Sequence, residues 1–224
     1  MINMMLNFPK TESTVLSDIL AFLKVRPTVS ALIRGRRLFL SRKRCDYINI
    51  GCGRNTFDTF YNLDYSWYKG IDACWDISRG LPFPDESFRG CFSEHCLEHV
   101  SLPVFKRVVA DVYRILRPGG CFRLIVPDAE IYLRGYFAEL NGNVVDIPYR
   151  NPLEEKTALM SINRIFREHG HQYAWDFRTI NIHLAEAGFV EIRNSNYMEG
   201  RDINLLIDNK GRAVESLYVE AVKP

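Results

Sequence analysis

The stretch Tyr47-Ile48-Asn49-Ile50-Gly51-Cys52-Gly53-Arg54-Asn55 decides the fold class. Its first four residues include two isoleucines and a tyrosine, which is typical of a strand in the interior of a sheet. Gly51 and Gly53 follow, and glycine lets the backbone turn with positive φ or approach a ligand closely. A strand that ends in Gly-x-Gly at the carboxyl edge of a parallel sheet is the usual place of a nucleotide site in α/β proteins.

From this strand to the end of the chain, short apolar segments alternate with amphipathic ones. The predicted strands are residues 47–50, 60–64, 71–76, 90–93, 121–126, 190–192 and 217–222, and the predicted helices are residues 103–116, 129–140 and 176–187. Residues 54–59 are too few for a long helix, so we expect a turn or a loop between the first two strands. The alternation predicts an α/β, Rossmann-like, doubly wound sheet of seven mostly parallel strands, with an antiparallel C-terminal strand.

The chain divides into an N-terminal extension and one domain. Residues 1–44 are predicted to be helical, with helical spacing over Ser13–Leu23, an interruption at Pro27 and a second helix over Val29–Leu40. Residues 45–224 form the domain, in which residues 127–170 break the rhythm and are expected to form a lid insertion. The basic segment 34–44 fits either an anionic partner or a solvated helix face.

The composition is that of an ordinary globular protein. Of 224 residues 47% are hydrophobic and 25% are charged, and the net charge is only +2, so no global field indicates nucleic acid or an anionic membrane as partner. The six cysteines form no C-x-x-C pair, which favours free thiols in a reducing compartment. We see no signal peptide and no apolar run long enough for a membrane span, and therefore expect a cytoplasmic protein whose oligomeric state stays open.

Two phosphate-binding motifs lose support at the glycine turn. A dinucleotide fingerprint needs a third glycine at position 56, where this chain has Thr56. The P-loop pattern G-x-x-x-x-G-K-[ST] is absent from the sequence. The absence of both motifs is compatible with a nucleoside ligand that has no phosphate. S-adenosylmethionine is such a ligand, and its site does not need the N-terminus of a long helix to bind a phosphate.

The order of the motifs supports this cofactor. Residues 48–53 resemble the first motif of class I S-adenosylmethionine-dependent methyltransferases. Four later segments resemble the motifs that follow it in the type 11 small-molecule branch: Asn62-Leu63-Asp64, Asp76-Ile77 before Leu81-Pro82-Phe83-Pro84, Leu97-Glu98-His99, and Leu116-Arg117-Pro118-Gly119-Gly120. The resemblance implies methyl transfer from S-adenosyl-L-methionine to a small-molecule acceptor and, by analogy alone, a sugar or secondary-metabolite intermediate.

The resemblance also implies the cofactor-binding residues. The glycine turn would hold the methionine part, the carboxylate after the second strand would bind the ribose hydroxyls, and the Asp-Ile pair after the third strand would recognise adenine, with Asp72 as a competing register. The implied residues are Asn49, Gly51, Cys52, Gly53, Asp64, Asp76, Ile77, Ser93 and Glu94. Two of the motif positions depart from the family pattern: Asn49 stands where many members have an acidic residue, and Asn55 replaces a third glycine.

Histidines are the candidates for the acceptor side. A hydroxyl or ammonium acceptor needs a base, and histidine has a suitable pKa. His95 follows the fourth strand and is the best placed, with His99 and His171 as further catalytic candidates. No histidine spacing is diagnostic of a metal, so we expect no metal site.

Two other functions stay open. The first is a non-catalytic binding module that has the methyltransferase fold. The second is an RNA methyltransferase, because the basic segment 34–44 could bind RNA. Against the latter, Ser93-Glu94-His95-Cys96 stands where base-amine methyltransferases have N/D-P-P-Y/F.

Overall fold

The computed structural model describes residues 25–36 and 40–224, and its centre is a seven-stranded sheet. The strand order is β3-β2-β1-β4-β5-β7-β6. The strands are β1 (Tyr47–Ile50), β2 (Phe60–Asp64), β3 (Ala73–Cys74), β4 (Phe88–Glu94), β5 (Leu116–Pro127), β6 (Val190–Ser195) and β7 (Ser216–Val222). β1 to β5 pair in parallel, whereas β7 is antiparallel to both β5 and β6. The predicted fold class is confirmed.

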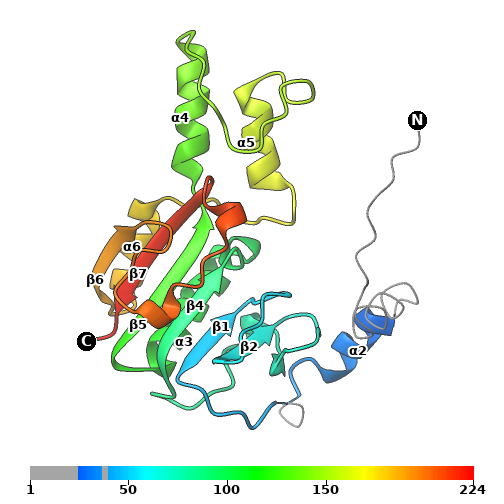
Figure 1. The fold of residues 1–224 in the computed structure, drawn as a ribbon, viewed down its shortest axis with the longest axis vertical. Coiled ribbons are helices and arrows are strands. Elements are labelled where there is room, and N and C mark those ends of the chain that lie inside the picture. The colour runs from blue at the N-terminus through cyan, green and yellow to red at the C-terminus, as the bar shows by residue number, and fades with distance from the viewer. Residues whose placement is uncertain (1–24, 37–39) are drawn as a thin grey trace.

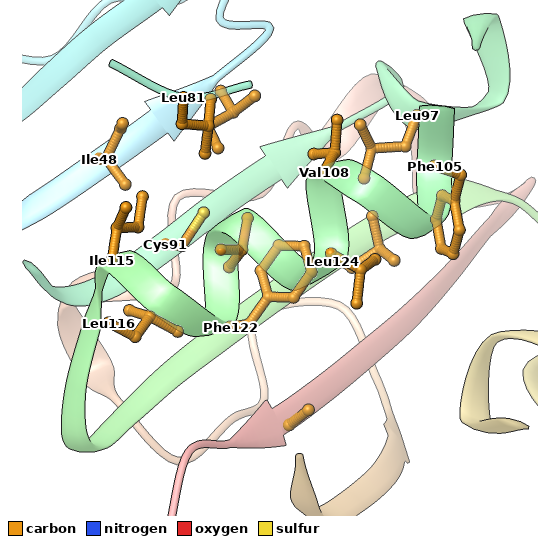
Figure 2. Packing of buried hydrophobic residues seen from close by; sticks show 14 of the residues in the cluster. Ile48, Leu81, Cys91, Leu97, Phe105, Val108, Ile115, Leu116, Phe122 and Leu124 are labelled. Atoms are coloured by element: carbon orange, nitrogen blue, oxygen red, sulfur yellow. The ribbon is translucent and has the colours of Figure 1, made fainter. Parts of the chain in front are cut away.

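One face of the sheet is covered by two helices, α3 (Leu102–Ile115) and α6 (Phe177–Glu186). The apolar residues of α3 recur every three or four positions, so they form one stripe that packs on the strands (Figure 2). Ile48 and Ile50 of β1 point into the same cluster, because alternate residues of a strand face the same side. This packing fixes the end of β1, and with it the glycine turn.

The opposite face is covered by the segment 196–215, which contains two short 3-10 helices, η4 (Ile203–Leu205) and η5 (Lys210–Arg212). Leu205 is fully buried there, against Phe60 of β2 and Phe92 of β4. Arg123 of β5 is also fully buried, and its guanidinium donates to both carboxylate oxygens of Asp208, at 2.8 and 2.5 Å, and to Glu220 Oε1 at 3.0 Å. A buried ion network therefore fastens this segment to the sheet.

Two further helices extend beyond the carboxyl end of β5, α4 (Ala129–Leu140) and α5 (Ala158–Arg167) (Figure 1). They pack on each other through a small separate core that includes Tyr132 and Ile162. The Tyr132 hydroxyl donates to Glu215 at 2.9 Å, which ties the pair to the main body. The bounds of α4 are those predicted, whereas α5 was not predicted.

The N-terminal helix of the described residues differs from the prediction. Helix α2 (Val25–Ile33) begins before Pro27, which its first turn accommodates since the amide hydrogens there lack helical partners anyway. The predicted interruption at Pro27 and the predicted bounds 29–40 were therefore wrong. The predicted helix over Ser13–Leu23 lies outside the described residues. Within residues 25–36 and 40–224, none of the helices has the length and apolar character to cross a membrane.

Five strands, β3 to β7, differ from the predicted ranges, and for two of them the structure shows why. β3 has only two residues, because Asp76 turns the chain into the 3-10 helix η2 (Ile77–Arg79) by accepting a hydrogen bond from the Ser78 amide at 3.0 Å. β5 starts at Leu116, which pairs with Phe88, so α3 ends one residue before the predicted boundary. Gly120 allows the bend in β5, since a Cβ there would lie 2.7 Å from the Arg117 carbonyl oxygen.

Candidate functional site

The glycine turn after β1 has the geometry that only glycine provides. Gly51 has φ +71° and Gly53 has φ +54°. The Gly51 amide donates to the Leu63 carbonyl at 2.8 Å, which holds the turn against β2. A Cβ on Gly51 would lie 2.2 Å from the Cys96 sulfur, so the loop after β4 packs directly on the turn. The turn thus joins the ends of three strands.

Asp64 lies beside this turn, at the end of β2. Its Oδ2 accepts a hydrogen bond from the Gly53 amide at 2.8 Å, and its Oδ1 accepts one from the Ser66 amide at 2.7 Å. Each carboxylate oxygen has a second lone pair, so the group retains acceptors for two hydroxyls. The residue predicted to bind the ribose therefore also shapes the loop that would hold the methionine.

The two departures from the family pattern contact each other. The side chain of Asn49 is buried, with 2% of the residue exposed, and its Nδ2 donates to the Asn55 carbonyl oxygen at 3.0 Å. An ionised aspartate at position 49 would place a carboxylate oxygen against the Asn55 carbonyl oxygen, and both atoms can only accept hydrogen bonds. Asn49 therefore stabilises the short crossover between β1 and β2, residues 54–59, which contains no helix.

The structure distinguishes the two candidate aspartates near β3. Asp72 Oδ2 accepts from the Asn62 amide at 2.9 Å and forms an ion pair with Lys43 at 3.3 Å, so its carboxylate holds β2, β3 and the preceding segment together. Asp76 caps η2 and lies next to the end of β2, where the Trp75 amide donates to the Asp64 carbonyl at 2.8 Å. Asp76, with Ile77 after it, is the one at the sheet edge that carries the glycine turn.

A cavity of about 430 Å³ opens at this edge. It is lined by Asn49, Gly51, Cys52, Arg54, Asn55, Thr56, Phe57, Phe92, Glu94, Ile207 and Asn209. Four of the predicted cofactor-binding residues are among these, whereas Gly53, Asp64, Asp76, Ile77 and Ser93 are not. Glu94 accepts a hydrogen bond from the Asn209 amide at 2.9 Å, and burial raises the pKa of its carboxyl group. Ser93, its neighbour in β4, is buried.

His95 follows β4 in a strained backbone conformation, with φ +48°. The Ser216 hydroxyl donates to the Arg212 carbonyl at 2.7 Å, so it accepts from His95 Nε2, 2.8 Å away. Arg212 Nη1 donates to His95 Nδ1 at 2.6 Å. Burial, together with the Arg212 charge, lowers the pKa of His95 to about 3. His95 is therefore neutral, and both ring nitrogens are engaged.

His99 and His171, the other two histidine candidates, meet at the carboxylate of Glu98. Oε1 of Glu98 lies 3.6 Å from His95 Nδ1, 3.7 Å from His99 Nε2 and 3.9 Å from His171 Nε2. Burial raises the pKa of Glu98 to about 8 and lowers the pKa values of His99 and His171.

Backbone pairing brings these segments together. The Gln172 amide donates to the Glu98 carbonyl at 2.8 Å, and the Gln172 side chain donates to the His99 carbonyl at 2.8 Å. His99 and His171 were predicted to lie on the acceptor side, whereas no role was predicted for Glu98. Glu98 lies between Leu97 and His99 in the 3-10 helix η3 (Leu97–His99). These three residues form one of the motifs that resemble the methyltransferase family, and that motif was the only indication in the sequence that Glu98 has a role.

The sheet order, the antiparallel β7, the glycine turn after β1 and the carboxylate after β2 together define a class of proteins. This is the α/β methyltransferase fold, which the chain shares with a solved SAM-dependent methyltransferase. Residues 68–124 match the family described as "Methyltransferase domain".

Known proteins resemble this chain in part of the sequence and in the fold. A crystal structure of a SAM-dependent methyltransferase from Archaeoglobus fulgidus aligns over 93% of this chain and 99% of its own, with a TM-score of 0.51 and 15% identity. Phthiotriol/phenolphthiotriol dimycocerosates methyltransferases of Mycobacterium tuberculosis and Mycobacterium bovis are 33% identical over 84 residues, which are 36% of this chain. The match spans 28% of the length of these curated relatives.

Proposed function

We propose that the chain transfers the methyl group of S-adenosyl-L-methionine to a small-molecule acceptor. The observation that carries this proposal is the cavity at the carboxyl edge of β1 and β4. Its volume of about 430 Å³ is in the range of small-ligand sites. Its walls come from the glycine turn and from Glu94, the two positions where this class brings cofactor and acceptor together.

The cofactor side needs little chemistry from the protein. A sulfonium is a strong electrophile with a neutral leaving group, so the main task is to hold the nucleophile in line with the S–CH₃ bond. We assign the methionine part to the turn at Gly51, Cys52 and Gly53, the ribose hydroxyls to Asp64, and the adenine to Asp76 with the Ile77 backbone. The hydrogen bond from the Gly53 amide to Asp64 supports this assignment, because it couples the two halves of the site.

The acceptor side is proposed to lie near His95, under α4 and α5 as a lid. A hydroxyl acceptor must lose a proton, yet His95 has both nitrogens engaged by Ser216 and Arg212. We therefore propose that His95 acts as a base only when Arg212 withdraws from Nδ1, and that it otherwise positions Arg212. The acceptor class, a sugar or a secondary-metabolite intermediate, follows from the family resemblance.

A reducing compartment such as the cytoplasm is proposed for the same chain. All six cysteines lie in the described part of the chain and are free thiols. Burial raises the pKa of Cys52 and Cys91, as it does for the other four. Protonated, buried thiols resist oxidation, which fits a protein that does not use disulfides.

Mass spectrometry of the chain purified without added ligand tests the proposal. We expect S-adenosylmethionine or S-adenosylhomocysteine to co-purify, and a bound acceptor would identify the substrate. The matched control is Gly51→Val, which fills the turn where Cys96 packs and should lose the nucleoside. Absence of both nucleosides, together with no conversion of S-adenosylmethionine in the presence of candidate acceptors, would contradict the proposal.

A further inference from the structure

The carboxylate of Glu98 is the most poorly satisfied buried group of the described residues. Its side chain is 2% exposed, and neither of its oxygens has a hydrogen-bond partner within the described part of the chain. A buried carboxylate without partners is costly, because it has lost its water and gained nothing in return. Such a group in a native protein commonly has a water, an ion or a catalytic role to explain it.

Two histidines place a ring nitrogen near this carboxylate, and for His171 that nitrogen carries a free lone pair. His171 Nδ1 lies 2.6 Å from the Ile165 carbonyl oxygen, which can only accept, so Nδ1 carries the proton and Nε2 carries the lone pair. Nε2 is the nitrogen that faces Glu98 Oε1. The Nε2 of His99 also faces Oε1. A backbone carbonyl on the far nitrogen is the usual way in which proteins orient metal-binding imidazoles.

The spacing fits an intervening ion better than a direct hydrogen bond. The two nitrogens lie 3.7 and 3.9 Å from Oε1, beyond hydrogen-bond reach, and the three ligand atoms lie within 4.8 Å of one another. Zinc with bonds of about 2.0–2.1 Å separates tetrahedral ligand atoms by about 3.4 Å. To bind zinc, the ligand atoms would therefore move toward one another by up to about 1.4 Å.

The surroundings leave room and charge for a cation. A small cavity of about 10 Å³, roughly that of one water, has Glu98 and His171 among its lining residues, whereas His99 does not line it. Arg212 is the nearby positive charge, and it is bound to His95 Nδ1, which explains why His95 is not counted as a ligand. The carboxyl groups of Glu94 and Glu215 also act on Glu98, so acidic groups outnumber the single guanidinium.

We propose that Glu98, His99 and His171 bind a divalent transition-metal ion of the zinc type, with a fourth position open to water or another ligand. Two imidazoles and one carboxylate are a common ligand set for zinc and for non-haem iron. The three ligands come from η3 and from the segment after α5, so the ion would fasten the base of the α4–α5 pair to the end of β4. The inference stands whether or not the chain transfers methyl groups.

Metal titration of the purified, tag-free chain tests it. After treatment with a chelator, the chain should bind one Zn²⁺ by calorimetry, and one Co²⁺ with the visible absorption of a low-coordinate site. Glu98→Gln and His171→Gln should each weaken Zn²⁺ binding at least tenfold. His183→Gln is the matched control, because His183 pairs with Glu186 on α6, and it should bind Zn²⁺ as the parent does.

Folding is checked separately, since Glu98 and His171 are buried. His99→Gln is the second variant, because the His99 side chain is 38% exposed and its loss should leave the fold intact. Zn²⁺ should raise the melting temperature of the parent and not that of folded His99→Gln. No Zn²⁺ binding by the parent, or equal binding by parent and folded His99→Gln, would overturn the inference.

Discussion

Arg123→Met tests how the cavity wall formed by the segment 196–215 is held in place. Arg123 is fully buried and binds Asp208 and Glu220. It also donates to the carbonyl oxygens of Glu199 at 2.9 Å and Asn196 at 3.0 Å. Methionine fills a similar volume but supplies none of these donors.

The magnitude follows from what the substitution leaves behind. Removal of one partner of a buried ion pair costs about 3–5 kcal/mol, because the remaining charge stays buried without compensation. For a domain of this size about 1 kcal/mol corresponds to about 2–4 °C, so the melting temperature should fall by about 6–20 °C. This is a large part of a total stability of about 5–15 kcal/mol. Cofactor affinity should fall as well, because Ile207 and Asn209 of the cavity wall adjoin Asp208.

Urea unfolding followed by circular dichroism measures the first effect. Arg134→Met is the matched control, because Arg134 pairs with Glu130 on the exposed face of α4, with 78% of its side chain exposed. Exposed pairs contribute about 0–1 kcal/mol, so this variant should unfold nearly as the parent does. Equal losses in the two variants, or a loss below about 1 kcal/mol for Arg123→Met, would refute the account of the buried network.

Three further predictions concern the glycine turn, the crossover and the thiols. Gly51→Ala should cost about 1–2 kcal/mol for its backbone conformation and about 1–3 kcal/mol more for the contact with Cys96, whereas Gly53→Ala, whose Cβ would meet nothing within 4 Å, should pay only the first cost. Urea unfolding that ranks the two equally would contradict this. Asn49→Ala should cost about 1 kcal/mol, and Asn49→Asp should cost more at neutral pH and recover at low pH. The reason is that burial raises the pKa of the introduced carboxyl group in the folded state, so stability is lost as the pH rises through that pKa; a pH-independent difference between the two variants would count against it. Because burial raises the pKa of all six thiols, Ellman's reagent at pH 8 should react slowly with the folded chain and quickly with all six after unfolding in guanidinium, and rapid labelling of the folded chain would be the contrary result.

The glycine turn could be predicted from sequence because its causes are local. The apolar residues of β1 and the two glycines specify a strand and a turn without reference to the rest of the chain. The short crossover was foreseen for the same reason, since six residues cannot form a long helix between parallel strands. What the sequence did not reveal is how the crossover is stabilised, because the bond from Asn49 to Asn55 depends on the path of the loop.

The Glu98 cluster could not be predicted, because it depends on contacts between distant segments. Glu98 and His171 meet only because the backbone at Gln172 pairs with Glu98 and the α4–α5 pair folds back onto the sheet edge. Histidine spacing along the chain carries no information about such a return. The same limitation applied to His95, whose neighbours Arg212 and Ser216 come from the far end of the chain.

Calorimetric titration with S-adenosylhomocysteine tests the central claim, that the glycine turn and Asp64 form the cofactor site. We expect one binding site in the parent chain. Asp64→Ala should weaken binding by about 1–3 kcal/mol, or about 5- to 150-fold, through the loss of acceptors for the ribose. Asp58→Ala, which removes an exposed carboxylate from the same crossover, should bind as the parent does. No heat from the parent, or equal affinity in the parent and a folded Asp64→Ala chain, would contradict the account.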